Sequence, residues 1–247
     1  MDLFNADFID ALQALVASHH GVYPRLPPRD IFFEDLVARS FQNIGVKDIV
    51  LSTPGRSKED MIVSGVKLSV KTETGYGTNP NLITITKLST TETTTWEPIP
   101  LVERILHHLS QYEEMLMLRA VWLDPPAFSY QLLQIPIDLL SLIKTANFEE
   151  VGRRSGRKSI GGDVFVGEKL AFHAHFDGAD GKCQIRNLAV NQCCLLKEWK
   201  HLIPPEWTDN WPIHTLKTYG KQAKKRAGGG HDELPSTGGQ QLDLFES

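Results

Sequence analysis

The residues best suited to chemistry lie on one short stretch between Asp60 and Glu73. Side chains of a β-strand alternate between its two faces, so Ser69, Lys71 and Glu73 are expected to share one face. The Ser-Gly pair at 64–65 is typical of a tight turn, which would place Asp60 on the neighbouring strand. The spacing therefore predicts that a carboxylate, a lysine and a second carboxylate meet at one end of a hairpin.

These side chains are the mixture that phosphodiester hydrolysis needs. A carboxylate such as Asp60 binds Mg²⁺ through hard oxygen ligands, and the metal polarises the phosphate and lowers the pKa of a bound water. A lysine such as Lys71 orients the attacking water or neutralises the developing charge. Ser69 either supplies an oxygen on the metal side or spaces the motif. The same alternation is also typical of the solvated face of an edge strand, so a role without chemistry stays open.

The motif resembles that of the PD-(D/E)XK nucleases. Asp60, followed on the next strand by Ser69-Val70-Lys71, is similar to the signature of this superfamily, and the likeness covers mainly residues 28–90. The superfamily includes most type II restriction endonucleases and the mismatch-repair nicking enzymes. The resemblance implies a mixed β-sheet flanked by helices, with the motif on a central hairpin, and an enzyme most like a type II restriction endonuclease.

Two positions depart from the family pattern. Glu59 stands where the family has proline, and Ser69 stands at the second acidic position. This form resembles one branch of restriction enzymes, in which the missing carboxylate comes from elsewhere in the site. Glu73 and Glu34 are the candidates, and with Asp60 they are the expected metal ligands. Family members often carry a glutamate on the helix just before the sheet, where Glu34 lies, although the helix dipole alone also favours a carboxylate there.

The periodicity of apolar residues predicts an α/β (α+β) fold, a mixed central sheet flanked by helices. Helical spacing covers residues 2–18, 30–43, 99–116 and 138–144. Strand patterns cover residues 48–52, 60–63, 66–73, 82–86, 116–122, 130–135, 163–166, 170–176 and 182–190. Residues 177–181 are a strong hairpin turn, and residues 152–162 are expected to be a loop.

Positive side chains that could contact DNA gather in the glycine-rich segment 152–159, namely Arg153, Arg154, Arg157 and Lys158. Arginine can bind guanine in the major groove with two hydrogen bonds, while serine and backbone groups meet phosphates. An ordinary solvated basic loop is the alternative. The following hairpin carries His173, Gln184 and Arg186 on alternating positions, where they are expected to read base edges.

The composition fits a specific DNA enzyme better than a protein that coats nucleic acid by charge. The net charge of the 247 residues is −4, so the basic groups must be local. Three cysteines with no spaced framework suit a reducing compartment. The beginning of the sequence lacks the pattern of a signal peptide, and no apolar run approaches the ~20 residues of a membrane helix. We therefore expect a cytoplasmic protein.

The end of the chain carries two further features. Lysines 217, 221, 224 and 225 with Arg226 form a second basic cluster, for phosphate binding or simply for solvation of a helix end. Residues 227–240 are rich in glycine and predict a flexible tail. Gln241, Leu242, Leu244 and Phe245 are similar to the peptide by which bacterial proteins bind the replication sliding clamp. Packing of the tail onto the domain is the alternative.

Three functions are consistent with these patterns. The first is a type II restriction endonuclease that makes Mg²⁺-dependent, site-specific double-strand cuts in unmethylated DNA. It would be a homodimer if the target is palindromic, and would be paired with a DNA methyltransferase of the same specificity. The second is a mismatch-type repair endonuclease tethered to the clamp, and the third is a non-catalytic DNA-binding protein.

We expect one endonuclease domain over residues 1–226, with a catalytic core at about 28–145 and a DNA-reading region at about 150–195, followed by a tail over 227–247.

Overall fold

The computed structural model describes residues 3–52, 60–90, 95–123, 126–154 and 156–208. The chain forms two compact units, Met1–Pro204 and Pro205–Ser247. The second basic cluster, the glycine-rich tail and the expected clamp-binding peptide lie outside the described residues. In the described part, the α-helices are α1 (Ala6–Val22), α2 (Asp30–Asn43), α3 (Pro98–Leu109) and α4 (Ile137–Ser141). The short 3₁₀ helices are η1 (Leu142–Thr145), η2 (Val190–Gln192) and η3 (Pro205–Trp207).

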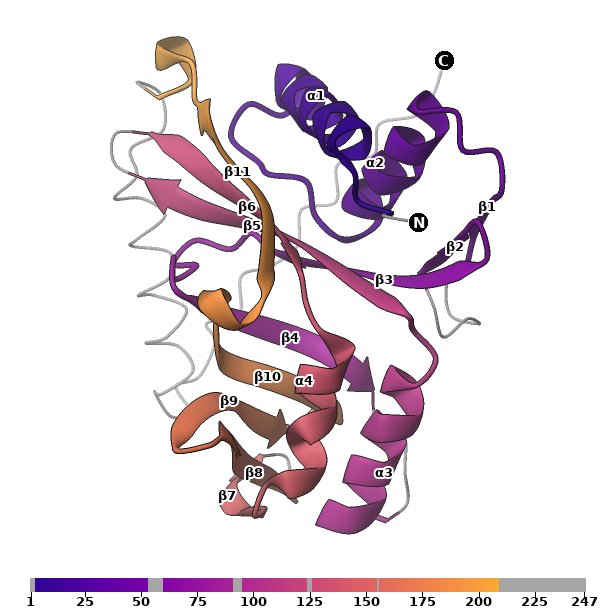
Figure 1. The fold of residues 1–247 in the computed structure, drawn as a ribbon. Helices are drawn as coiled ribbons and strands as arrows, with labels where there is room; N and C mark the ends of the chain where they lie inside the picture. Colours follow the sequence, from indigo (N-terminus) through magenta and orange to yellow (C-terminus); the bar gives the residue numbers. More distant parts are fainter. Residues whose placement is uncertain (1–2, 53–59, 91–94, 124–125, 155, 209–247) are drawn as a thin grey trace, which may run out of the picture. The chain divides into compact units, whose positions relative to one another are not determined.

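The strands of the first unit form two sheets (Figure 1). The first has the order β1-β2-β3-β5-β6-β11, and it is mixed because β3 and β5 run parallel while the other neighbours run antiparallel. Its strands are β1 (Ile49–Leu51), β2 (Met61–Val63), β3 (Val66–Glu73), β5 (Glu114–Leu123), β6 (Ala127–Gln134) and β11 (Cys194–Leu202). The second is antiparallel, with the order β4-β10-β9-β8-β7. Its strands are β4 (Leu82–Thr90), β7 (Glu149–Arg154), β8 (Arg157–Val166), β9 (Lys169–Phe176) and β10 (Lys182–Ala189).

Helices α1 and α2 cover one face of the first sheet, as Figure 1 shows. Asn5 caps α1 by accepting a hydrogen bond from the Phe8 backbone N–H at 3.0 Å. Phe8 stacks on Phe41 of α2 with ring centroids 4.3 Å apart. Phe33 of α2 and Leu68 of β3 are fully buried in the same core. This packing fixes α2, and therefore Glu34, over the strand that carries the motif.

The other face of the first sheet packs on a second core, formed with α3, α4 and the second sheet. Strand β5 contributes to both cores, because Met117 enters the second core while Leu116 and Leu118 enter the first. Ile105 of α3 and Ile185 of β10 are buried against the same second core. The motif strand β3 pairs with β5 and packs Leu68 and Val70 into the first core.

The α+β class with a mixed sheet is confirmed, but the predicted end of one helix and one predicted loop are wrong. The helix expected over 99–116 ends at Leu109, and strand β5 begins at Glu114, because the apolar run after Glu114 is buried on both faces of a sheet. The loop expected over 152–162 is the β7-β8 hairpin. Its Gly161 has the neighbouring His173 side chain 2.9 Å from where a Cβ would lie, so glycine there serves close packing inside a sheet. In the described residues, no helix is long and apolar enough to cross a membrane.

Candidate active site

Asp60 immediately precedes β2 and lies beside β3. Its backbone N–H donates to the Leu68 carbonyl oxygen at 3.1 Å, which continues the β2-β3 ladder and places Asp60 opposite Ser69. Its Oδ2 accepts hydrogen bonds from the Val70 backbone N–H at 2.6 Å, from Ser69 Oγ at 3.1 Å and from Lys71 Nζ at 3.2 Å. These donors hold the carboxylate in one orientation by a single oxygen.

Lys71 lies on the same strand face as Ser69, as the β3-β5 register shows. Its ammonium also donates to the Val70 carbonyl oxygen at 3.2 Å, and the side chain is 18% exposed. A charge-assisted contact of this kind, partly removed from water, is screened less than a surface pair. The structure thus brings the predicted Asp60 and Lys71 into direct contact.

Glu34 of α2 lines the same cleft as Asp60 and Lys71. Partial burial raises the pKa of Glu34, the negative charge of Asp60 raises it further, and Lys71 opposes both effects. The first residue of α2, Asp30, lines the cleft as well, and its N–H donates to Thr72 Oγ1 at 3.4 Å. Asp30 was not among the residues predicted from the sequence, although an acidic residue at a helix start is a recognisable pattern.

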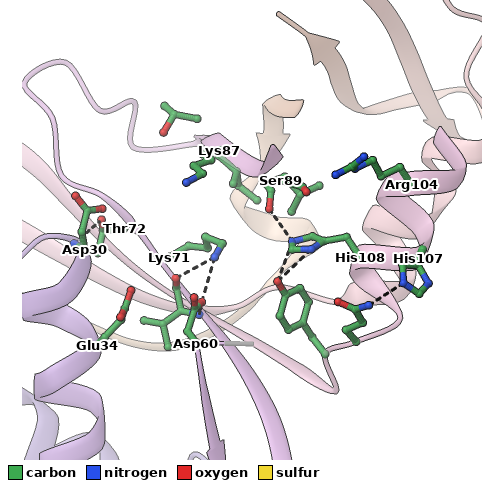
Figure 2. A pocket seen from close by; sticks show the side chains of 16 residues that line it. Asp30, Glu34, Asp60, Lys71, Thr72, Lys87, Ser89, Arg104, His107 and His108 are labelled. Atoms are coloured by element: carbon green, nitrogen blue, oxygen red, sulfur yellow. Dashed lines mark hydrogen bonds and ion pairs between the residues drawn. The ribbon is translucent and has the colours of Figure 1, made fainter. Parts of the chain in front are cut away.

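The cleft has a volume of about 730 Å³ and is lined from α2, β3, β4 and α3 (Figure 2). Its polar lining also includes side chains that were not predicted from the sequence. They are Lys87 and Ser89 on β4, Arg104, His107 and His108 on α3, and Gln111 and Tyr112 directly after α3. The stripe Arg104, His107 and Gln111 has helical spacing opposite the buried Ile105 and Leu109, and this amphipathic pattern is the signal that could have found it.

Glu73 lies elsewhere, although it shares the strand face of Lys71. Its Oε2 accepts from Arg119 Nε at 2.7 Å, and its Oε1 accepts from the Thr84 backbone N–H at 3.0 Å. Arg119 is fully buried and also donates to Gln131 Oε1 at 2.6 Å. Burial raises the pKa of Glu73, while the guanidinium lowers it. The carboxylate of Glu73 is thus used to join β3, β4 and β5, and it is not in the cleft lining.

The basic residues predicted to contact DNA from the β7-β8 hairpin have partners of their own. Glu150 accepts from Arg153 Nε at 2.8 Å and lies 3.3 Å from Lys158 Nζ. The Arg157 guanidinium stacks 4.8 Å from the ring centre of Trp96. Arg154 belongs to β7, but its side chain is outside the described part. These residues form a group on the second sheet, separate from the cleft lining.

The residues predicted to read bases lie on the polar face of the same sheet. His173 Nδ1 is 2.7 Å from Asp163 Oδ1 on the neighbouring strand. The Arg186 guanidinium donates to Gln184 Oε1 at 2.6 Å, which fixes the pair on one face of β10. These residues also lie outside the cleft lining.

The donor set at Asp60 and Glu34 suits a hard divalent cation. Among the described residues, Asp60 Oδ1 makes no hydrogen bond that competes for it, while Oδ2 is fully engaged. No group of three or more histidine, cysteine or acidic side chains able to hold a metal occurs in the part of the chain that the structure describes. Mg²⁺ does not require such a cage, because one or two carboxylates with waters and substrate phosphates are its usual ligands.

Comparison with known proteins decides between the functions that the sequence left open. The family model of SmaI, described as a type II site-specific deoxyribonuclease, matches residues 1–201. This chain belongs to that family. It is a type II restriction endonuclease, and its partner is DNA. The match spans both sheets, so the second sheet is part of the enzyme and not an addition to it.

A relative gives the same result over most of the chain. The type II restriction enzyme SmaI of Serratia marcescens is 28% identical over 207 residues, which cover 83% of this chain and 83% of the relative. No solved structure matches the chain. The first function predicted from the sequence is thereby confirmed. Enzymes of this type generally need a divalent metal ion, which agrees with a carboxylate-lined cleft.

Proposed function

We propose that Asp60, Glu34 and Lys71 form the catalytic centre of this restriction endonuclease, with Mg²⁺ held by the two carboxylates. The observation that carries the proposal is the orientation of Asp60, whose Oδ2 receives three hydrogen bonds from β3. This arrangement leaves Oδ1 as a ligand, with Glu34 lining the same cleft. The proposal assigns the missing carboxylate of the Ser-x-Lys motif to Glu34 and gives Glu73 a structural role.

Each side chain of the proposed centre has a distinct task. A Mg²⁺ ion bound there supplies Lewis acidity toward the phosphate and a water of lowered pKa. Lys71 holds a positive charge beside Asp60, where it orients the attacking water and stabilises the charge that develops on the phosphate. Ser69 donates to Asp60 and keeps that carboxylate in place. With the motif on the β2-β3 hairpin of a mixed sheet, this centre supports membership of the PD-(D/E)XK superfamily and its fold.

Substitution of the proposed residues tests this centre. Asp60→Asn is expected to reduce the cleavage rate of unmethylated phage DNA by about 10³-fold or more, because the metal loses a charged ligand. Lys71→Ala is expected to cost about 10²–10³-fold. Asp48→Asn and Lys67→Ala are matched controls, because both residues are exposed and outside the cleft lining. Full cleavage by the Asp60 and Lys71 variants would disprove the assignment.

We propose that the enzyme is a homodimer acting on a palindromic site, together with a methyltransferase of the same specificity. Protein symmetry then matches the symmetry of the DNA. Large apolar side chains exposed between the end of α1 and the start of α2 support a protein contact: Val22 (71% exposed), Tyr23, Leu26, Ile31 (61%) and Phe32 (55%). Light scattering should give twice the chain mass. The double variant Ile31→Ser/Phe32→Ser should give the mass of one chain in the same measurement. A mass that stays at two chains would refute this interface.

The predicted contacts with DNA also belong to this proposal. We propose that Arg153, Arg154, Arg157 and Lys158 contact the DNA backbone from the β7-β8 hairpin, and that His173, Gln184 and Arg186 read bases. The paired Gln184 and Arg186 support base reading because their donors are already oriented. Clamp binding by the peptide at 241–245 and a single endonuclease domain over 1–226 stay predictions.

A further inference from the structure

Among the described residues of the lining, those from β4 and α3 include positive side chains and no carboxylate. Lys87 comes from β4, and Arg104 and His107 are three residues apart on one face of α3. Figure 2 shows Glu34 at one end of the labelled side chains and Arg104 and His107 at the other, with Lys71 between them. The acidic end of the cleft, with Glu34, is therefore separate from its basic wall, which we define as Lys87 and Arg104. Asp60 and Lys71 lie between Glu34 and Arg104.

The basic wall is held in place by His108. The Nε2 atom of His108 lies 2.9 Å from the carbonyl oxygen of Leu88 on β4 and 2.8 Å from the hydroxyl of Tyr112. Leu88 directly follows Lys87 and is buried in the second core. Burial lowers the pKa of His108, and the charge of Lys71 lowers it further, which favours the neutral ring at neutral pH. His108 is thus a positioning residue that joins α3 to β4, and not part of the positive charge.

The β4 and α3 side of the cleft suits a chain of phosphates even without a metal ion, because Lys87 and Arg104 come from these elements whereas Asp30 and Glu34 come from α2. In the part of the chain that the structure describes, the lining contains the carboxylates of Asp30, Glu34 and Asp60 and the cations of Lys71, Lys87 and Arg104. A divalent cation at the acidic end would add to the attraction for phosphates. A volume of about 730 Å³ accommodates a short stretch of one DNA strand and not a whole duplex. The phosphates next to the scissile one would then meet the basic wall.

We propose that Lys87 and Arg104 bind backbone phosphates of the cleaved strand beside the scissile phosphate and so hold that strand in register with Asp60 and Lys71. The inference deepens the proposed catalytic centre and rests on it for the position of the scissile phosphate. Phosphate contacts fix the register of DNA but carry no sequence information. The two residues are therefore expected to act on affinity for any duplex, and not on the choice of target.

The test measures binding of the full chain to DNA in EDTA, where no metal-dependent cleavage occurs. The probes are two short fluorescent duplexes, one containing the target found by sequencing the enzyme's fragment ends and one of mixed sequence. Lys87→Ala and Arg104→Ala are compared with Lys144→Ala, which removes an exposed cation of η1 outside the cleft lining. Dissociation constants are measured from about 0.05 to 0.3 M salt, where the slope of log K against log salt counts phosphate contacts.

Each of the two variants is expected to weaken binding to both duplexes by roughly 3–10-fold and to reduce the magnitude of the salt slope by about 0.9. Lys144→Ala should leave both quantities unchanged. Unchanged affinity and slope in a folded Lys87→Ala/Arg104→Ala double variant would overturn the proposal, and so would a loss confined to the target duplex, which indicates base reading. Thermal melting confirms that the variants fold. Because EDTA removes catalysis from the measurement, an error in the assignment of Asp60 or Lys71 appears only in cleavage assays.

Discussion

Changing Glu73 to glutamine is expected to lower the stability of the enzyme and to spare its metal-dependent chemistry, whereas Glu34→Gln should do the opposite. Both residues were candidates for the carboxylate missing at Ser69. The structure separates them, because Glu34 lines the cleft with Asp60 while Glu73 is paired with Arg119. The two isosteric substitutions therefore distinguish a metal ligand from a structural carboxylate.

The size of the Glu73 effect follows from the burial of its partner. The side chain of Arg119 is 0% exposed and that of Glu73 is 13% exposed, with 2.7 Å between Nε and Oε2. Removing one charge from a buried pair costs about 3–5 kcal/mol, because the other charge stays buried without compensation. The remaining acceptors on Arg119, among them Gln131 Oε1, favour the lower end of this range. For a chain of this size, such a loss lowers the melting temperature by roughly 6–20 °C.

Glu34 is expected to behave differently in the same melting experiment. Among the described residues its carboxylate forms no ion pair with a buried cation, unlike that of Glu73, so glutamine should change stability by no more than about 0.5 kcal/mol. Single-turnover cleavage of a plasmid, measured over a range of Mg²⁺ concentrations, should fall by about 10²-fold or more and require more metal. Asp35→Asn is the matched control, since Asp35 is an exposed neighbour on α2 that pairs with Arg39. Loss of cleavage in Glu73→Gln with an unchanged melting temperature would refute the reasoning.

Two further predictions concern stability as well as activity. Ser69→Ala should lower the free energy of unfolding by about 1 kcal/mol, because a buried hydrogen bond that orients Asp60 is lost. It should also raise the Mg²⁺ concentration needed for half-maximal cleavage several-fold. Thermal melting measures the first effect and a metal titration measures the second. Burial and the neighbouring His201 lower the pKa of His20 from 6.5 to about 4. Between pH 6.5 and about 4, the unfolded chain therefore binds a proton at this histidine that the folded chain does not. The folded state keeps its full stability above pH 6.5 and loses up to about 3 kcal/mol as the pH falls toward 4. His20→Gln should flatten the melting temperature between pH 7 and 5, whereas replacing the exposed His107 should not.

The part of the site that could be predicted from sequence is the part made within one hairpin. Asp60 and Lys71 are close in the chain, and strand alternation with a turn at 64–65 is enough to bring them together. The observed strands β2 and β3 begin and end within a residue of the expected ones. Local spacing carries this information because the hairpin needs no distant residue to set its register.

The parts that could not be predicted depend on residues far apart in the chain. Glu73 has the same strand face as Lys71, and only the docking of Arg119, 46 residues later, shows that its carboxylate is already used. Arg104 lies within a correctly expected helical stretch, but its position in the cleft depends on how α3 packs against β4. The glycines of 152–162 indicate a loop by composition, whereas His173 uses the space that Gly161 leaves. Each of these outcomes is set by tertiary packing.

The serine in the motif accounts for a second carboxylate coming from a helix in the proposed centre. Ser69 is 0% exposed and lies opposite Asp60, with its hydroxyl donating to Oδ2. A carboxylate at this position would bury a like charge against Asp60, which disfavours ionisation of one of the two. Serine instead supplies a donor, and in the proposed centre the second negative charge is that of Glu34 on the cleft surface, where a bound cation and water would offset it. Because the buried Phe33 anchors this turn of α2 in the first core, the geometry of the proposed metal site depends on how α2 packs against the sheet.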